Sequence, residues 1–150
     1  MPVHIDKACS QMAQKRPDAV VYVYSGGLAL GSALASRLAV PLFPLDVRYP
    51  LSRMMHAHPL TGPLFWPVKE LLYRMTRPTP PSHKRKATIP PGITSIILAD
   101  DRISTFRTMN KCLEMLNYAG IDRTRIQIAT QRCGQKSRRL VDFEIQLSST

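Results

Sequence analysis

The chain has 150 residues, 44% of them hydrophobic, and a formal net charge of +11 at pH 7. Length and composition predict one globular domain over residues 1–150 and exclude a chain that is disordered throughout. No apolar run reaches the length of a membrane span and no secretory signal is visible, so we expect a cytoplasmic protein without membrane contact. The positive charge favours anionic partners, either phosphorylated metabolites or nucleic acid.

The first third of the sequence has the pattern of a helix followed by a strand–helix–strand unit. β-Branched and aromatic residues predict a buried strand, and a run rich in Ala and Leu predicts a helix packed closely on a sheet. Such a unit implies parallel pairing of its strands. The second strand contains Pro44, which places it near a sheet edge. The predicted elements are a helix over residues 4–16, a strand over 19–24, a loop of Ser25, Gly26 and Gly27, a helix over 28–39 and a strand over 42–47.

Residues 49–92 differ in composition, because proline recurs throughout and the polar part is strongly basic. We expect a flexible segment here, interrupted by a short helix over residues 68–75. Apolar and aromatic side chains over residues 60–75 favour a homodimer contact. The basic run Lys84–Lys86 fits a lid that closes over a diphosphate, a contact to nucleic-acid phosphates, or a solvated loop.

Regular elements return in the last third of the chain. The predicted elements are a strand over residues 96–99, a helix from a cap at Ser104 or Thr105 to about residue 119, and strands over 125–130 and 140–147. Strands and helices therefore alternate on both sides of the proline-rich segment. This alternation predicts an α/β fold of three layers, with a mainly parallel central sheet flanked by helices.

Two neighbouring acids, Asp100 and Asp101, follow the apolar strand and precede a run of hydroxyl side chains. Acids at the carboxyl end of a strand lie where open α/β sheets bind ligands, and a cation or the hydroxyls of a ribose would relieve their repulsion. For the acids alone, a solvated turn or a helix cap is the alternative. A helix cap needs one hydroxyl side chain, whereas this segment has three: Ser104, Thr105 and Thr108. Together with the backbone N–H groups at the start of a helix, these hydroxyls favour a phosphate site.

The loop Ser25-Gly26-Gly27 also follows a strand and precedes a helix. Paired glycines allow a backbone to approach a ligand closely, although a plain strand-to-helix turn is the alternative. Loops at the carboxyl ends of parallel strands lie at the same edge of a sheet. We therefore expect this glycine loop and the two acids to face one cleft.

Residues 96–108, Ile-Ile-Leu-Ala-Asp-Asp-Arg-Ile-Ser-Thr-Phe-Arg-Thr, resemble the motif that binds phosphoribosyl pyrophosphate (PRPP) in the type I phosphoribosyltransferases. That motif has several apolar residues, two acids, two mostly apolar residues and then Thr-Thr-Gly-x-Thr or a close variant. Residues 20–41 resemble the family's pyrophosphate-loop strand and the helix after it. Residues 49–92 stand where the family has its flexible catalytic loop, and residues 138–145 are similar to the C-terminal hood of members that act on 6-oxopurines.

The resemblance implies a small C-terminal hood and an enzyme of nucleotide metabolism. Its reaction would transfer the ribosyl 5′-phosphate group of PRPP to a nucleobase or similar nitrogen acceptor and release pyrophosphate, with Mg²⁺ held near the two acids, directly or through the substrate. The acids would be the catalytic residues. By position in the motif, the ribose hydroxyls of PRPP would contact Asp100 and Asp101. Its 5′-phosphate would contact Ser104, Thr105, Phe106, Arg107 and Thr108. Its pyrophosphate would contact Ser25, Gly26 and Gly27.

Three positions depart from the family pattern. Phe106 stands where the motif has a small residue, and Arg102 replaces a usually apolar residue. Ser104 stands where the enzymes for 6-oxopurines have an Asp that acts on the base. These departures and the positive charge leave a second hypothesis open: a catalytically weak PRPP-sensing or nucleic-acid-binding regulator on the same fold.

Overall fold

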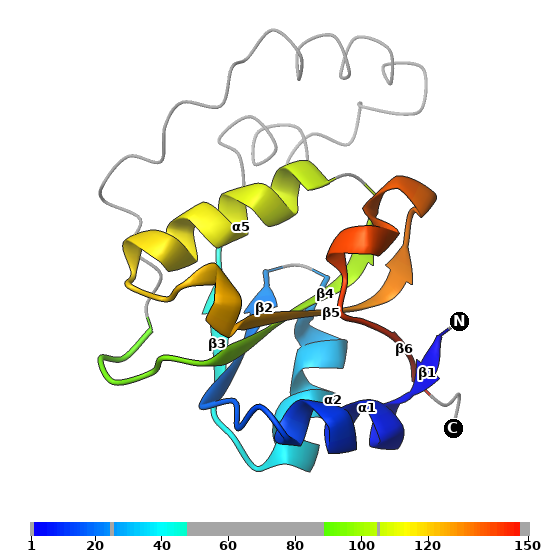
Figure 1. The fold of residues 1–150 in the computed structure, drawn as a ribbon, viewed down its shortest axis with the longest axis horizontal. Coiled ribbons are helices and arrows are strands. Elements are labelled where there is room, and N and C mark those ends of the chain that lie inside the picture. The colour runs from blue at the N-terminus through cyan, green and yellow to red at the C-terminus, as the bar shows by residue number, and fades with distance from the viewer. Residues whose placement is uncertain (1, 25, 48–88, 105, 148–150) are drawn as a thin grey trace, which may run out of the picture. The chain divides into compact units, whose positions relative to one another are not determined.

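The computed structural model describes residues 2–24, 26–47, 89–104 and 106–147, which belong to one compact unit. The strands of this unit form a single parallel sheet in the order β1-β6-β5-β4-β2-β3 (Figure 1). Predictions that fall on residues 48–88 lie outside the described residues. The elements are β1 (Val3–His4), α1 (Ile5–Ala13), β2 (Ala19–Val23), α2 (Leu28–Leu38), β3 (Leu42–Leu45), β4 (Ile96–Ile103), α5 (Phe106–Tyr118), η2 (Arg123–Arg125), β5 (Ile126–Cys133), η3 (Gln135–Leu140) and β6 (Phe143–Gln146).

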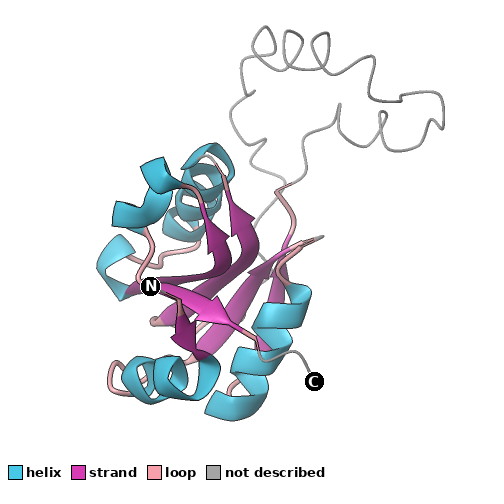
Figure 2. Ribbon diagram, turned by 90° about the vertical axis from the view of Figure 1, so that its right-hand side faces the viewer, coloured by secondary structure: helices cyan, strands magenta, loops and turns pink. Residues whose placement is uncertain are grey.

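Helices cover both faces of the sheet, α5 on one face and α1 with α2 on the other (Figure 2). Successive side chains of a strand point to opposite faces, so each central strand supplies both cores. The core under α5 includes Val21, Ile96, Leu98, Ile128, Met109, Cys112 and Leu116. The core under α1 and α2 includes Val20, Ile97, Ala99, Ala129, Ile5, Met12, Leu30 and Leu34. The predicted α/β fold with helices on both sides of a parallel sheet is therefore confirmed.

The neighbours of β2 account for two features of the sequence. β3 is the edge strand beside β2, and its Pro44 lies opposite Tyr22. An edge position accepts a proline because no second neighbouring strand requires its missing N–H group. Gly31 lets α2 pack closely on the sheet, since an added β-carbon would lie 2.9 Å from the β-carbon of Tyr22. The edge position of this strand and the close packing of the helix are both confirmed.

Some element boundaries differ from those predicted. The first helix spans Ile5–Ala13 rather than residues 4–16, because Val3–His4 pair with β6 as strand β1. The last strand spans Phe143–Gln146, and the residues before it form η3 instead of extending the strand. A strand of two residues is too short to show an alternating pattern in the sequence. Among helices of the described residues, none has the length and apolar character needed to cross a membrane.

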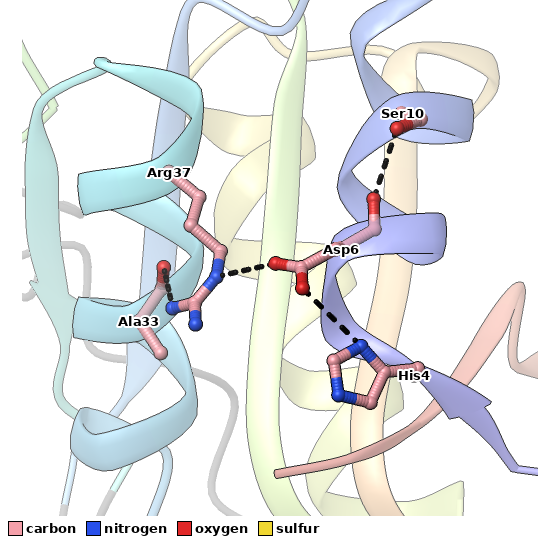
Figure 3. A network of polar contacts seen from close by, with 5 residues as sticks. All are labelled: His4, Asp6, Ser10, Ala33 and Arg37. Atoms are coloured by element: carbon pink, nitrogen blue, oxygen red, sulfur yellow. Dashed lines mark hydrogen bonds and ion pairs between the residues drawn. The ribbon is translucent and has the colours of Figure 1, made fainter. Parts of the chain in front are cut away.

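Polar contacts connect α1 with α2 (Figure 3). Nε of Arg37 on α2 lies 2.9 Å from Oδ1 of Asp6 on α1, and Nη1 of Arg37 donates to the Ala33 carbonyl at 3.4 Å. Nδ1 of His4 lies 3.4 Å from Oδ2 of Asp6, and the Ser10 hydroxyl donates to the Asp6 carbonyl at 3.0 Å. Because the charged groups are exposed, each such pair contributes only about 0–1 kcal/mol. Burial of the apolar core beneath these contacts therefore contributes most to holding α1 and α2 on the sheet.

Candidate functional site

The two predicted acids lie inside β4 rather than after it. This strand is one of the two central strands of the sheet (Figure 1). The sequence prediction ended this strand at Ala99, because the acids and Arg102 interrupt the apolar run; the structure continues it to Ile103. β5 extends with it, so that Arg102 and Ile103 pair with Arg132 and Cys133. The pairing with β2 ends at Ala99. Beyond that residue, β4 has β5 on one side and the glycine loop after β2 on the other.

Asp100 and Asp101 have different surroundings. Asp100 is only 7% exposed. Burial, and after it the charge of Asp100, raise the pKa of the Cys112 thiol on α5 to about 12. Asp101 is exposed, and its carboxylate lies against Gly26. One acid is thus held in the protein interior, and the other borders the glycine loop.

Close approach to β4 explains both glycines of the loop. A β-carbon on Gly27 would overlap the carbonyl oxygen of Ala99 and would lie 3.0 Å from the backbone nitrogen of Val23. A β-carbon on Gly26 would overlap the Asp101 carboxylate and would lie 2.6 Å from its Cγ atom. The φ angle of Gly27 is −73°, which any residue adopts. Packing, and not an unusual backbone angle, is therefore what requires Gly27. The structure brings the predicted glycine loop and the predicted acids together.

Burial is the main reason why the pKa of Asp100 rises to about 7. A hydrogen bond with the Asp101 carboxyl group and the negative charge of Asp101 raise it further, whereas backbone N–H groups of Asp101 and Arg102 lower it. Near neutral pH the acid pair therefore carries less than two full negative charges. A cation or a pair of hydroxyl donors would favour the ionised form, so the pair is suited to bind either.

The predicted phosphate residues lie at the turn from β4 into α5. Ser104 is an exposed residue between the two elements, and α5 begins at Phe106. Arg107 is exposed and Thr108 is half-buried in the first turn of this helix. A helix start presents N–H groups without intrahelical partners and the positive end of the helix dipole. Ser25, Thr105 and the side chain of Phe106 lie outside what the structure describes.

The residues after β5 fold back against the end of β4. The Gly134 amide donates to the Ile103 carbonyl at 2.9 Å, and an added β-carbon on Gly134 would lie 3.0 Å from the Ser104 carbonyl oxygen. Glu144 of β6 lies 3.3 Å from Nη2 of Arg138 on η3. Gly134, which precedes the segment suggested as a hood (residues 138–145), therefore borders the turn between the acids and α5.

Sequence reasoning missed Arg132. It lies on β5 as the register partner of Arg102 on β4, and both side chains are exposed. Strand pairing makes neighbours of residues that are far apart in the chain, and no local pattern reveals this. An extension of the strand predicted over residues 125–130 would have placed Arg132 at this edge of the sheet.

A magnesium ion fits the acid pair only if the substrate supplies further ligands. Within residues 2–24, 26–47, 89–104 and 106–147, no three His, Cys, Asp or Glu side chains are grouped as a metal site. Mg²⁺ is commonly held by one or two carboxylates together with substrate phosphates. Asp101 is exposed to such a ligand. Burial, and after it the interactions with Asp101, raise the pKa of Asp100, and a nearby cation would favour the ionised form. The two acids therefore suit a metal ion that binds with its phosphorylated substrate.

Comparison with known proteins gives a structural likeness only: no family model and no curated protein matches the sequence. Purine phosphoribosyltransferase from Pyrococcus horikoshii Ot3 is similar in structure, with a TM-score of 0.58 and 18% identity over 97% of this chain and 80% of its own. Xanthine-guanine-hypoxanthine phosphoribosyltransferase from Helicobacter pylori has a TM-score of 0.49 and 11% identity over 93% of this chain and 74% of its own. The likeness to the Pyrococcus enzyme shows that the chain has a phosphoribosyltransferase fold.

Proposed function

We propose that the protein is a PRPP-dependent phosphoribosyltransferase. The observation that carries the proposal is the contact between Asp101 and Gly26, because it joins the acids of the motif to the glycine loop at one edge of the sheet. The start of α5 follows the acids directly, so a ribose and two separate phosphate groups each have a matching neighbour. The structural likeness to a purine phosphoribosyltransferase does not favour the alternative of a catalytically weak regulator.

Each part of the site would contact a different part of PRPP. Asp100 and Asp101 would accept hydrogen bonds from the ribose hydroxyls. The N–H groups and hydroxyls of residues 104–108 would bind the 5′-phosphate at the positive end of α5. The loop over residues 25–27 would bind the pyrophosphate through its backbone. This assignment uses the close approach of the loop to β4, which leaves Asp101 next to Gly26.

The reaction would form a bond between the acceptor nitrogen and C1 of the ribose while the bond from C1 to pyrophosphate breaks. The bonding electrons leave with pyrophosphate, and an acceptor nitrogen that carries a proton loses it to solvent or to the leaving group. The protein would contribute by holding the ribose at two hydroxyls and by directing backbone N–H groups toward the developing negative charge. Bound Mg²⁺ would supply charge neutralisation for the diphosphate.

Calorimetric titration with PRPP and Mg²⁺ tests this proposal. The wild-type protein should bind, and the Asp100→Asn/Asp101→Asn variant should lose at least about tenfold in affinity, since a hydrogen bond to a charged group contributes about 1.5–3 kcal/mol. Asp122→Asn is the matched control, because Asp122 is an exposed acid just before β5, at the opposite end of that strand. Its amide can still accept from the Thr124 amide, which donates to Asp122 at 2.8 Å.

Absence of PRPP binding by the wild-type protein would overturn the proposal. Equal binding by the double variant and the wild type would place PRPP away from the acids. For a protein that binds, release of pyrophosphate with a panel of nucleobases distinguishes a transferase from a PRPP-sensing regulator.

A further inference from the structure

Building on the function above, we propose that the acceptor is an anion: a nitrogen heterocycle that carries a carboxylate or a comparably acidic group. Arg102 and Arg132 bind this acidic group. The two arginines are register partners on neighbouring parallel strands, β4 and β5, and both side chains are exposed. Partners in a parallel pair project from the same face of the sheet. The register therefore makes the two arginines neighbours on one face of the sheet, and Arg102 directly follows Asp101 in the chain.

The two guanidinium groups are not neutralised within the described part of the chain. Neither has an ion pair or a side-chain hydrogen bond there. Other arginines do: Arg37 pairs with Asp6, and Arg138 pairs with Glu144. Like charges directly opposite each other on paired strands are destabilising. Two adjacent positive charges without partners therefore favour an anionic ligand at this position.

The position of the arginines points to the acceptor rather than to PRPP. In the proposed function the phosphates of PRPP lie at the glycine loop and at the start of α5, and the ribose lies at the acids. The arginine pair lies past the acids and beside β5, where the amide of Gly134 fastens the C-terminal segment to Ile103. Neither arginine belongs to the segments assigned to the two phosphate groups, which are residues 25–27 and 104–108. Guanidinium groups bind a carboxylate through two parallel hydrogen bonds, so this pair would select for charge.

The sequence alone indicates one of the two arginines. Arg102 stands where the related motif has a usually apolar residue. The pairing with Arg132 gives the substitution a chemical partner. An extended polyanion such as RNA needs a wider basic surface than two residues on adjacent strands, so a small anionic acceptor is the better match.

The test compares heterocycles that carry a carboxylate with counterparts that lack this negative charge. Pyrophosphate release is measured with orotate against uracil and with nicotinate against nicotinamide, using wild-type protein and the Arg102→Gln and Arg132→Gln variants. We expect the wild type to prefer at least one carboxylate over its neutral counterpart by about tenfold or more in kcat/KM. Either variant should lower kcat/KM for that carboxylate by about 10–100-fold, with KM for PRPP unchanged. Arg125→Gln is the control, because Arg125 is exposed and lies just before β5, at its opposite end.

The outcomes separate this inference from the function on which it rests. If PRPP binds but no carboxylate is preferred, or if Arg132→Gln raises KM for PRPP instead, the anionic-acceptor proposal is wrong and the PRPP proposal stands. If PRPP does not bind at all, both are wrong. Weakened binding of single-stranded RNA in both arginine variants, with acceptor kinetics unchanged, would assign the pair to nucleic acid and overturn the proposal. Thermal unfolding of each variant verifies that it remains folded.

Discussion

A carboxyl group buried beside a second carboxyl group is costly to ionise, and Asp100 is in this situation. In the unfolded chain its pKa is near 3.8, whereas in the folded protein it is about 7. Between these values the folded state binds more protons than the unfolded state. Stability therefore falls as the pH rises through this window, and the loss persists above it. A ligand that stabilises the ionised pair would recover part of this free energy.

Replacing Asp100 with Asn should stabilise the ligand-free protein at alkaline pH. The variant removes the buried charge, so its melting temperature relative to wild type should be higher at about pH 8 than at about pH 4. The gain in the free energy of unfolding of the variant over wild type should be larger at pH 8 than at pH 4 by roughly 1–3 kcal/mol. This is less than the pKa shift of Asp100 gives at about 1.36 kcal/mol per unit, because the carboxyl group is not completely shielded from solvent. Thermal unfolding at both pH values measures it. A difference between variant and wild type that does not depend on pH would refute the account of Asp100.

At the scale of elements, the sequence predicted the order and type of the main strands and helices but not where the central strands end. β2, α2 and α5 match their predicted ranges within one or two residues, because their apolar periodicity is strong. β4 and β5 extend beyond their apolar runs into charged residues. Backbone pairing between neighbouring strands stabilises such an extension even where the side chains are exposed, and this contribution leaves no hydrophobic pattern.

The candidate site was predictable to a similar extent. The proximity of Gly26 to Asp101 follows from parallel pairing of two strands that the sequence indicates. The burial of Asp100 and the pairing of Arg102 with Arg132 depend on the packing of α5 and on the register of β5. These are long-range features, so no reading of residues 96–108 alone contains them.

The two glycines of the loop should respond differently to substitution by alanine. Gly27→Ala forces a β-carbon into the backbone carbonyl of Ala99, so the loop or the strand must move, at a cost of about 1–3 kcal/mol or more. The three atoms nearest to a β-carbon on Gly26 all belong to the carboxylate of Asp101, a side chain that can rotate away. We expect Gly27→Ala to lower the melting temperature clearly, and Gly26→Ala to lower it less while weakening PRPP binding. Equal melting temperatures for both variants would contradict the described packing of the loop.

At the scale of the whole molecule, the compact unit accounts for the fold and leaves several expectations untested. The homodimer contact over residues 60–75 and the basic run at Lys84–Lys86 lie outside the described residues. The single-domain organisation, the cytoplasmic location and contact with nucleic acid likewise stay predictions. The formal charge of +11 is in accord with anionic ligands such as PRPP. What the molecule does provide is an edge of the sheet where acids, glycines and a helix start are adjacent.

A crystal structure of the protein with PRPP and Mg²⁺ tests the shared pocket most directly. We predict that the ribose hydroxyls lie within hydrogen-bonding distance of Asp100 or Asp101, with the 5′-phosphate at the start of α5 and the pyrophosphate at the loop of Gly26 and Gly27. A complex in which PRPP occupies another surface, and in which these acids contact only solvent, would contradict the account.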